Sequence, residues 1–173
     1  VRTLGFDAFE SISAPYMGEV FADGIHIGSK NALSAEKRMF KLKNSLCTDV
    51  FLLKLIPGTS PDIFDWLQQK HYRGIVIEAF GMGGTHFERR NLIPKLKKLV
   101  ANDVSVVVCS QCLYEKSDLS LYEVGRRLLE CGVIPGRDMT TEAIVTKLMW
   151  ALGQTQNPTE VRQIFDTNYA GEV

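Results

Sequence analysis

The chain has 173 residues, of which 45% are hydrophobic and 23% are charged, and its 20 basic residues are balanced by 20 acidic ones. This composition is typical of a globular domain with a hydrophobic core. Because the net charge is zero, no overall field would recruit nucleic acid or an anionic membrane surface. No apolar run approaches the roughly 20 residues that cross a bilayer, and "VRTLGFDAFE" lacks the apolar core of a signal peptide. The chain begins at Val1 rather than at methionine, so we expect a fragment or a processed product.

The first 46 residues differ in pattern from the rest of the chain. The stretch "MGEVFADGIHIG" is typical of two short strands that turn at Asp23-Gly24. The basic stretch "SAEKRMFKLKNSL" is compatible with a loop, a strand or a short helix. We therefore predict a surface arm and interdomain linker over residues 1–46 and a folded domain over residues 47–173.

Within the predicted domain, apolar runs alternate with amphipathic segments. The apolar runs predict three strands, at Val50–Ile56, Gly74–Phe80 and Val104–Ser110. Helical spacing of apolar residues follows each strand and recurs twice more, at 63–67, 92–100, 121–131, 144–152 and after Asn157. This alternation predicts a parallel sheet, and the solid apolar runs indicate strands covered on both faces. The predicted fold is α/β: a small three-layer domain with a mainly parallel sheet flanked by helices, flavodoxin-like or Rossmann-like.

Two more expectations concern the C-terminal helices. Trp150 lies in an apolar helical stretch, which predicts a position in the core. The stretch "NPTE" predicts a helix start with Asn157 as the cap, Pro158 in the first turn and Glu160 reaching back as in a capping box.

The second predicted strand runs into a cluster of glycines, "GIVIEAFGMGG". A dinucleotide-binding fingerprint would begin at Gly81 and Gly83, but His86 stands at its third glycine position. A phosphate-binding loop would need Gly-Lys-Ser/Thr, which does not occur in the sequence. The residues alone favour a tight turn, while the alternative is a ligand site at the carboxyl ends of the strands.

The third strand is followed by "SQCLYEKSDLSLYEVG", which is rich in polar side chains. One interpretation is an ordinary solvated loop, with Ser117 or Asp118 capping the next helix. The other is that this loop and the glycine loop share one rim and form a polar edge there. His86 is the one histidine that would lie beside such an edge.

The four cysteines are Cys47, Cys109, Cys112 and Cys131. Zinc would need a second ligand pair besides "CSQC", and neither the other cysteines nor the three histidines supply one. A thioredoxin-type pair would open a helix, whereas this pair begins within an apolar strand. We therefore expect reduced thiols in a cytoplasmic protein, with no metal and no cofactor.

Four segments of the chain carry a resemblance to a known family: "GFDAF", "GIVIEAFGMGG", "SQCLYEKSDLSLYEVGRRLLECGVIPGRDMTTEAIVTKLMWALGQT" and "EVRQIFDTNYAGEV". Together they resemble the C-terminal portion of type I (cytoplasmic) L-asparaginases. They also resemble the asparaginase-like subunit of the archaeal tRNA-dependent amidotransferase. Residues 28–44 match nothing in either group.

The resemblance implies a linker followed by the smaller of two α/β domains. Members of the family use threonine nucleophiles and a lysine in motifs that do not occur here, so these groups would lie upstream of Val1. No serine or threonine in the sequence stands convincingly beside a base, and we expect no catalytic residue in this chain. Paired subunits of the family set this domain against a neighbour's active site, which implies a homo-oligomer, dimer or tetramer, that binds asparagine or aspartate.

The resemblance also implies positions for the site. On the substrate side it places Gly81, Gly83, Gly84 and Asp118, and on the interface or effector side Glu78, Ser110, Gln111 and Cys112. Many relatives have asparagine in place of Gly84, some have arginine in place of Glu78, and an amide is common in place of Asp118. A carboxylate at residue 118 could pair with the amino group of an amino-acid ligand.

Three rival interpretations stay open. Within the superfamily, the chain could belong to an amidotransferase subunit that generates ammonia for a partner subunit. It could instead be a free-standing flavodoxin-like module that binds a nucleotide or a small metabolite. It could also be a purely structural dimerisation domain. The main interpretation involves neither nucleic acid nor a membrane.

Overall fold

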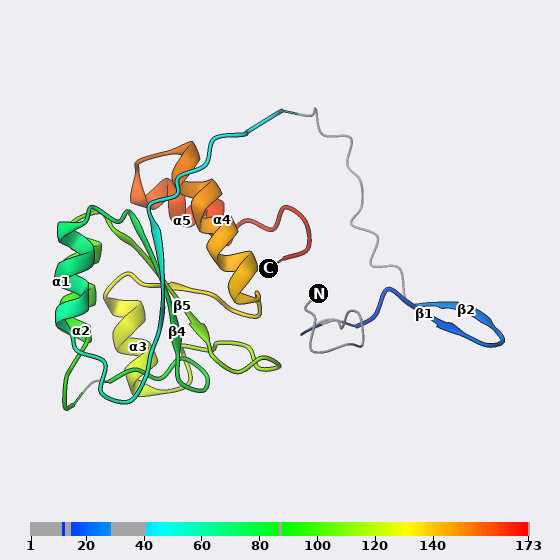
Figure 1. Ribbon diagram of the computed structural model, residues 1–173, viewed down its shortest axis with the longest axis horizontal. Helices are drawn as coiled ribbons and strands as arrows, with labels where there is room; N and C mark the ends of the chain where they lie inside the picture. Colours follow the sequence, from blue (N-terminus) through cyan, green and yellow to red (C-terminus); the bar gives the residue numbers. More distant parts are fainter. Residues whose placement is uncertain (1–11, 13–14, 29–40, 87, 173) are drawn as a thin grey trace. The chain divides into compact units, whose positions relative to one another are not determined.

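The computed structural model describes residues 12, 15–28, 41–86 and 88–172 (Figure 1). The described residues up to Leu42 belong to one compact unit, and Lys43 onward form a second. The basic stretch "SAEKRMFKLKNSL" was compatible with a loop, a strand or a short helix. Its first seven residues, 34–40, lie outside the described residues. The domain boundary between residues 46 and 47 stays a prediction.

The first unit contains a β-hairpin. Strand β1 (Gly18–Phe21) pairs antiparallel with β2 (Gly24–Ile27). Ala22 and Asp23 form the turn, and Gly24 opens the second strand with a φ of 143°, which glycine tolerates best. The predicted pair of short strands is confirmed, but the turn lies one residue earlier than the predicted Asp23-Gly24.

The second unit is built on a parallel sheet. Its strands lie in the order β3-β4-β5-β6, with every neighbouring pair parallel. They are β3 (Val50–Lys54), β4 (Gly74–Ala79), β5 (Ser105–Ser110) and β6 (Ile134–Pro135). The first three confirm the predicted strands, while β6 was not predicted because two residues, one of them proline, give no periodic signal.

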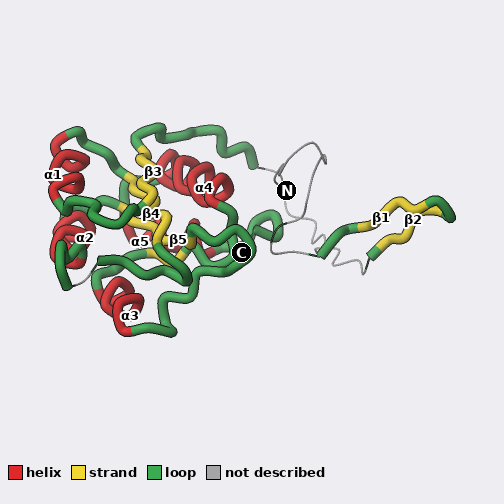
Figure 2. Tube along the Cα trace, turned by 60° about the horizontal axis from the view of Figure 1, so that its bottom comes forward, coloured by secondary structure: helices red, strands yellow, loops and turns green. Residues whose placement is uncertain are grey.

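Helices cover both faces of this sheet, as Figures 1 and 2 show. They are α1 (Asp62–Gln69), α2 (Ile93–Ala101), α3 (Glu123–Glu130), α4 (Thr141–Gln154) and α5 (Pro158–Asp166). On one face, Ile75 and Ile77 of β4 pack into a core with α1, α2 and α3. On the other, Val76 packs with α4 and α5. The three-layer α/β fold is confirmed, and its two cores follow from the alternation of side chains along a strand.

Three local expectations were wrong. Leu121 precedes α3 instead of facing the core from it, and its side chain is 53% exposed. Trp150 is only half-buried, because its Nε1 donates to the Lys43 carbonyl at 2.9 Å near the surface. Glu160 accepts a hydrogen bond from the Thr155 hydroxyl at 2.6 Å rather than from the amide of the cap.

Thr155 explains the altered cap. Its hydroxyl oxygen accepts the N–H of Asn157 at 3.1 Å, so the donor that a capping-box glutamate would satisfy is already bonded. Asn157 itself caps α5 as predicted, accepting the N–H of Thr159 at 2.9 Å. None of the described helices is long and apolar enough to cross a membrane.

The C-terminal tail is held against α4 by an almost buried lysine. Lys147 Nζ donates to the Thr167 carbonyl at 2.7 Å and to Glu172 Oε1 at 2.6 Å. Burial alone would raise the pKa of Glu172, but the Lys147 hydrogen bond and those from the Ala170 and Tyr169 amides lower the pKa to about 2. The side chain of Glu172 is only 21% exposed, so solvent screens this pair weakly.

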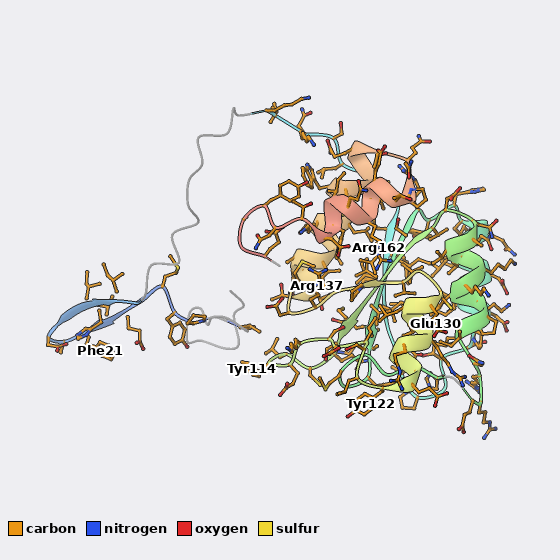
Figure 3. The ribbon with its side chains drawn as sticks, turned by 180° about the vertical axis from the view of Figure 1, so that it is seen from behind. Phe21, Tyr114, Tyr122, Glu130, Arg137 and Arg162 are labelled. Atoms are coloured by element: carbon orange, nitrogen blue, oxygen red, sulfur yellow. The ribbon has the colours of Figure 1, made fainter. Side chains whose placement is uncertain are left out.

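This arrangement predicts a specific acid sensitivity. A carboxylate with a lowered folded-state pKa stabilises the fold above its ordinary pKa of 4.5, and this stabilisation is lost as the pH falls toward about 2. Glu172→Gln should therefore lower the free energy of unfolding at neutral pH by up to about 3 kcal/mol and flatten its dependence on pH in that window. Denaturant unfolding at a series of pH values measures both effects. Glu130→Gln, an exposed change on α3, is the control (Figure 3), and equal slopes for the Glu172 variant and the unaltered chain would contradict the assignment.

Candidate functional site

The carboxyl ends of the parallel strands meet at one edge of the sheet, where open α/β sheets bind their ligands. Ala79 at the end of β4 pairs with Ser110 at the end of β5, so the segments that follow them start side by side. We call the described residues of the segments that follow β3, β4 and β5 the rim, namely 55–61, 80–86, 88–92 and 111–122. Tyr114 and Tyr122 are exposed on the last of these segments (Figure 3).

The glycine loop, residues 80–85, is a closed turn. The amides of Gly83 and Gly84 donate to the carbonyl of Phe80 at 3.0 and 2.7 Å, and the Phe80 amide donates to the carbonyl of Gly84 at 2.9 Å. Gly81 and Gly83 have φ values of 50° and 121°, in the region that favours glycine. Because the Gly83 and Gly84 amides already donate hydrogen bonds within the turn, they are not free to bind a phosphate. The tight-turn interpretation is the one that the structure supports.

The glycine loop contacts the loop after β5 directly. The N–H of Asp118 donates to the carbonyl of Met82 at 3.1 Å. A Cβ on Gly83 would lie 2.3 Å from Cδ2 of Leu119, well inside van der Waals contact. The two loops therefore share one rim, and Gly83 is the residue that lets them approach so closely.

Asp118 is held in a fixed, ionised state. Its Oδ1 accepts from the hydroxyl of Ser120 at 2.6 Å and from the Ser120 amide at 3.0 Å. Both hydrogen bonds lower the pKa of Asp118 below its ordinary value, and the bond from the Ser120 hydroxyl has the larger effect. The helix that follows begins after Tyr122 without a side-chain cap, so the expectation that Ser117 or Asp118 caps it was wrong.

Ser110 and Gln111 brace the rim. The hydroxyl of Ser110 donates to the carbonyl of Gly81 at 2.5 Å and accepts the amide of Cys112 at 2.8 Å. Gln111 Nε2 donates to the carbonyls of Leu55 and Glu78 at 2.7 and 2.9 Å. Both Gln111 contacts are oxygens, so only the amide nitrogen can face them, and the side chain has one possible orientation.

Glu78 lies on the face of the sheet that α4 covers. Its Oε1 accepts from the hydroxyl of Thr141 at the first turn of α4, at 2.7 Å, and Oε2 lies 3.7 Å from Lys54 Nζ. A carboxylate at a helix N-terminus is stabilised by the helix dipole.

Burial raises the pKa of the neighbouring Cys109 to about 11, so this thiol is not a nucleophile at neutral pH.

The site residues proposed from the sequence thus fall into two connected groups. Gly81, Gly83, Gly84 and Asp118 form one group, which Ser110 joins through Gly81. Glu78 and Gln111 form a second group toward α4, joined through the Glu78 carbonyl. Cys112 is an exposed free thiol, the other three cysteines are free as well, and the described residues contain no cluster that could hold a metal ion.

Two buried polar atoms of the glycine loop and its flank have no hydrogen-bond partner: Thr85 Oγ1 and His86 Nδ1. The other ring nitrogen of His86 accepts from the amide of Gly58 at 3.5 Å, which ties this segment to the one after β3. The hydroxyl of Thr85 thus makes no hydrogen bond to a base in this structure. Met82 and Leu119, which join the two loops, were missed because no sequence pattern marks a backbone carbonyl or a packed leucine as part of a site.

The contact of Gly83 with Leu119 predicts a sharp difference between neighbouring glycines. Gly83→Ala should destabilise the chain by at least about 2 kcal/mol, because it combines a φ of 121° with the clash against Leu119. Gly84→Ala is the matched control, since its Cβ would meet nothing closer than the Phe80 carbonyl oxygen at 3.3 Å and Phe80 Cβ at 3.9 Å. Thermal unfolding of both variants measures the difference. Equal melting temperatures would show that the loops are not held together by this contact.

Comparison with known proteins agrees with this architecture. The L-asparaginase of Thermococcus kodakarensis is 40% identical over 173 residues, which are all of this chain and 52% of that protein. A glutamyl-tRNA(Gln) amidotransferase subunit of Pyrococcus abyssi is also 40% identical, over all of this chain and 39% of its own length. The chain thus spans about half, or less, of these relatives.

Solved structures give the same result. The thermostable L-asparaginase from Thermococcus kodakarensis superposes with a TM-score of 0.87 over 99% of this chain and 51% of its own. L-asparaginase I from Vibrio cholerae superposes with a TM-score of 0.86 at 26% identity, covering 99% of this chain and 52% of its own. The sequence also matches the Glutaminase/Asparaginase C-terminal domain over residues 49–165. Because this match takes in well over half of the chain, the protein belongs to the Glutaminase/Asparaginase C-terminal domain family.

Proposed function

We propose that this chain is the C-terminal part of a cytoplasmic L-asparaginase, which hydrolyses asparagine to aspartate and ammonia through an acyl-enzyme. The observation that carries this proposal is the rim, in which the glycine loop and Asp118 are fixed against each other at the carboxyl edge of a domain of this family. Support comes from the match of the whole chain to an L-asparaginase. The nucleophile and base would then be supplied by a part of the enzyme outside these residues.

The role proposed for the domain is to complete a neighbouring subunit's active site. An ionised Asp118, held by Ser120, is suited to bind the ammonium group of an amino-acid substrate. Large apolar side chains stand exposed around this edge, which supports its burial against another subunit. They are Ile56, Tyr114, Leu121 and Tyr122.

A second candidate is an amidotransferase subunit, which would release ammonia for a partner. It is favoured by the equal identity, 40%, to the amidotransferase subunit of Pyrococcus abyssi. Copurification of the native protein with a second subunit, or with tRNA, would select this alternative over a self-contained asparaginase.

The first test is ammonia release from asparagine and from glutamine. The chain by itself should release none, whereas its fusion to the amino-terminal half of the Thermococcus kodakarensis enzyme, which this chain does not cover, should be active. The coupled assay for ammonia then identifies the preferred amide. Turnover by the 173-residue chain alone would overturn the placement of the nucleophile elsewhere.

The second test addresses Asp118 in the same fusion protein. Asp118→Asn keeps an oxygen for Ser120 but removes the charge, so KM for asparagine should rise about tenfold, which corresponds to one charge-assisted contact of roughly 1.4 kcal/mol. Glu115→Gln, an exposed change on the same loop, should leave KM unaltered. An unchanged KM in the Asp118 variant would instead favour a purely structural role for this domain.

A further inference from the structure

A cavity of about 410 Å³ lies between the loop that carries Asp118, the end of α3 and the segment that begins with Pro135 at the end of β6. Its volume falls in the range of small-molecule sites, roughly 300 to 1,000 Å³. It belongs to the second unit alone, so it does not depend on a neighbouring subunit or on the proposed enzymatic function. Nothing in the glycine loop lines it.

The walls of this cavity are fixed by backbone hydrogen bonds. The amide of Ser117 donates to the carbonyl of Arg137 at 2.7 Å, which joins the two segments across the cavity. The amide of Gly136 donates to the carbonyl of Val108 at 2.7 Å, which anchors the second segment to β5. The cavity is therefore preformed rather than a gap between mobile loops.

The lining combines an apolar floor with charges of both signs. Leu119, Leu129 and Pro135 supply apolar surface. Lys116 and Asp138 also line the cavity with exposed side chains, and the charge of Lys116 helps to lower the pKa of Asp118. Charges of opposite sign beside an apolar floor match a ligand that carries both charges and an apolar body.

Arg137 adds a second cation to the lining. It has a φ of 57°, a left-handed conformation that is uncommon for a residue with a side chain. Its Nη2 lies 2.9 Å from Asp166 Oδ1, yet a guanidinium has five N–H donors, and some stay free for a ligand carboxylate. Non-glycine residues in this conformation concentrate at ligand sites, where the surroundings hold them in place.

We propose that this cavity binds a small zwitterion with an apolar side chain, of the α-amino-acid class. The ligand's carboxylate contacts Lys116 and Arg137, its ammonium group contacts Asp138, and its side chain lies on Leu129 and Pro135. A simple anion would leave the Asp138 carboxylate without a partner, and an apolar molecule would leave Lys116, Arg137 and Asp138 all without one.

The test is a titration of the 173-residue chain with L-leucine, in which NMR spectra monitor the amide chemical shifts of residues 116–120 and 136–138. Saturable binding is expected with a Kd of about 1 mM or tighter. Isocaproate, which lacks the ammonium group, and isopentylamine, which lacks the carboxylate, should each bind at least about tenfold more weakly.

Arg137→Gly provides the matched variant, because glycine fits the left-handed backbone and the substitution removes only the side chain. It should weaken L-leucine binding about tenfold, and Lys116→Ala, an exposed change, should do the same. Arg162→Gln is the control, since Arg162 also lies near Asp166, with Nε 3.7 Å from Oδ2, but does not line the cavity (Figure 3).

Three results would overturn the proposal: no saturable shift with L-leucine, binding of isocaproate as tight as that of L-leucine, or equal weakening by the Arg137 and Arg162 variants. The first would leave the cavity without a ligand of this class, and the second would make it a plain anion site. The third would trace the effect to Asp166 rather than to the cavity. Because no turnover is measured, none of these results bears on the proposed asparaginase function.

Discussion

The parallel pairing of β4 with β5 is the constraint on which the other features of the domain depend. It places Ala79 opposite Ser110, so both strands end together and their following loops start at neighbouring points of one edge. An antiparallel pair would have sent these loops to opposite ends of the sheet. The contact between the glycine loop and the Asp118 loop is a consequence of this strand direction.

Backbone groups make most of the contacts that hold the rim. Carbonyls at Gly81, Met82 and Glu78 accept hydrogen bonds from groups at the end of β5 or after it. These bonds connect segments that are distant in sequence, and they leave the Asp118 carboxylate as a charged group on a rigid support. Rigidity of this kind suits a site that must present one charge to a ligand at a defined place.

The loop that carries Asp118 lies between two surfaces. One surface meets the glycine loop and is the proposed substrate side. The other lines the cavity with Lys116, Arg137 and Asp138. A ligand in the cavity would touch the segment that sets the position of Asp118, so the two sites are connected through one short stretch of chain, 116–120.

The order of strands and helices other than β6, the fold class and the family resemblance could all be read from the sequence. Their physical basis is local: apolar periodicity, helix caps such as Asn157, and turn residues such as Gly24 act within a few residues of themselves. The tight turn at Gly81–Gly84 was also favoured by the sequence, because positive φ values are a property of glycine itself.

The partners of the site residues were decided only by the tertiary structure. Gln111 bonds to Leu55, Gly83 packs on Leu119, and Trp150 bonds to Lys43, and each of these contacts joins residues far apart in the sequence. Strand β6 is likewise a strand only because β5 lies beside it. Such contacts form when the sheet brings distant segments together, and no local pattern encodes them. The sequence by itself therefore determined the helices, the three longer strands and the family they belong to, while the packing of the sheet decided that β6 forms and which side chains meet at the edge of the sheet.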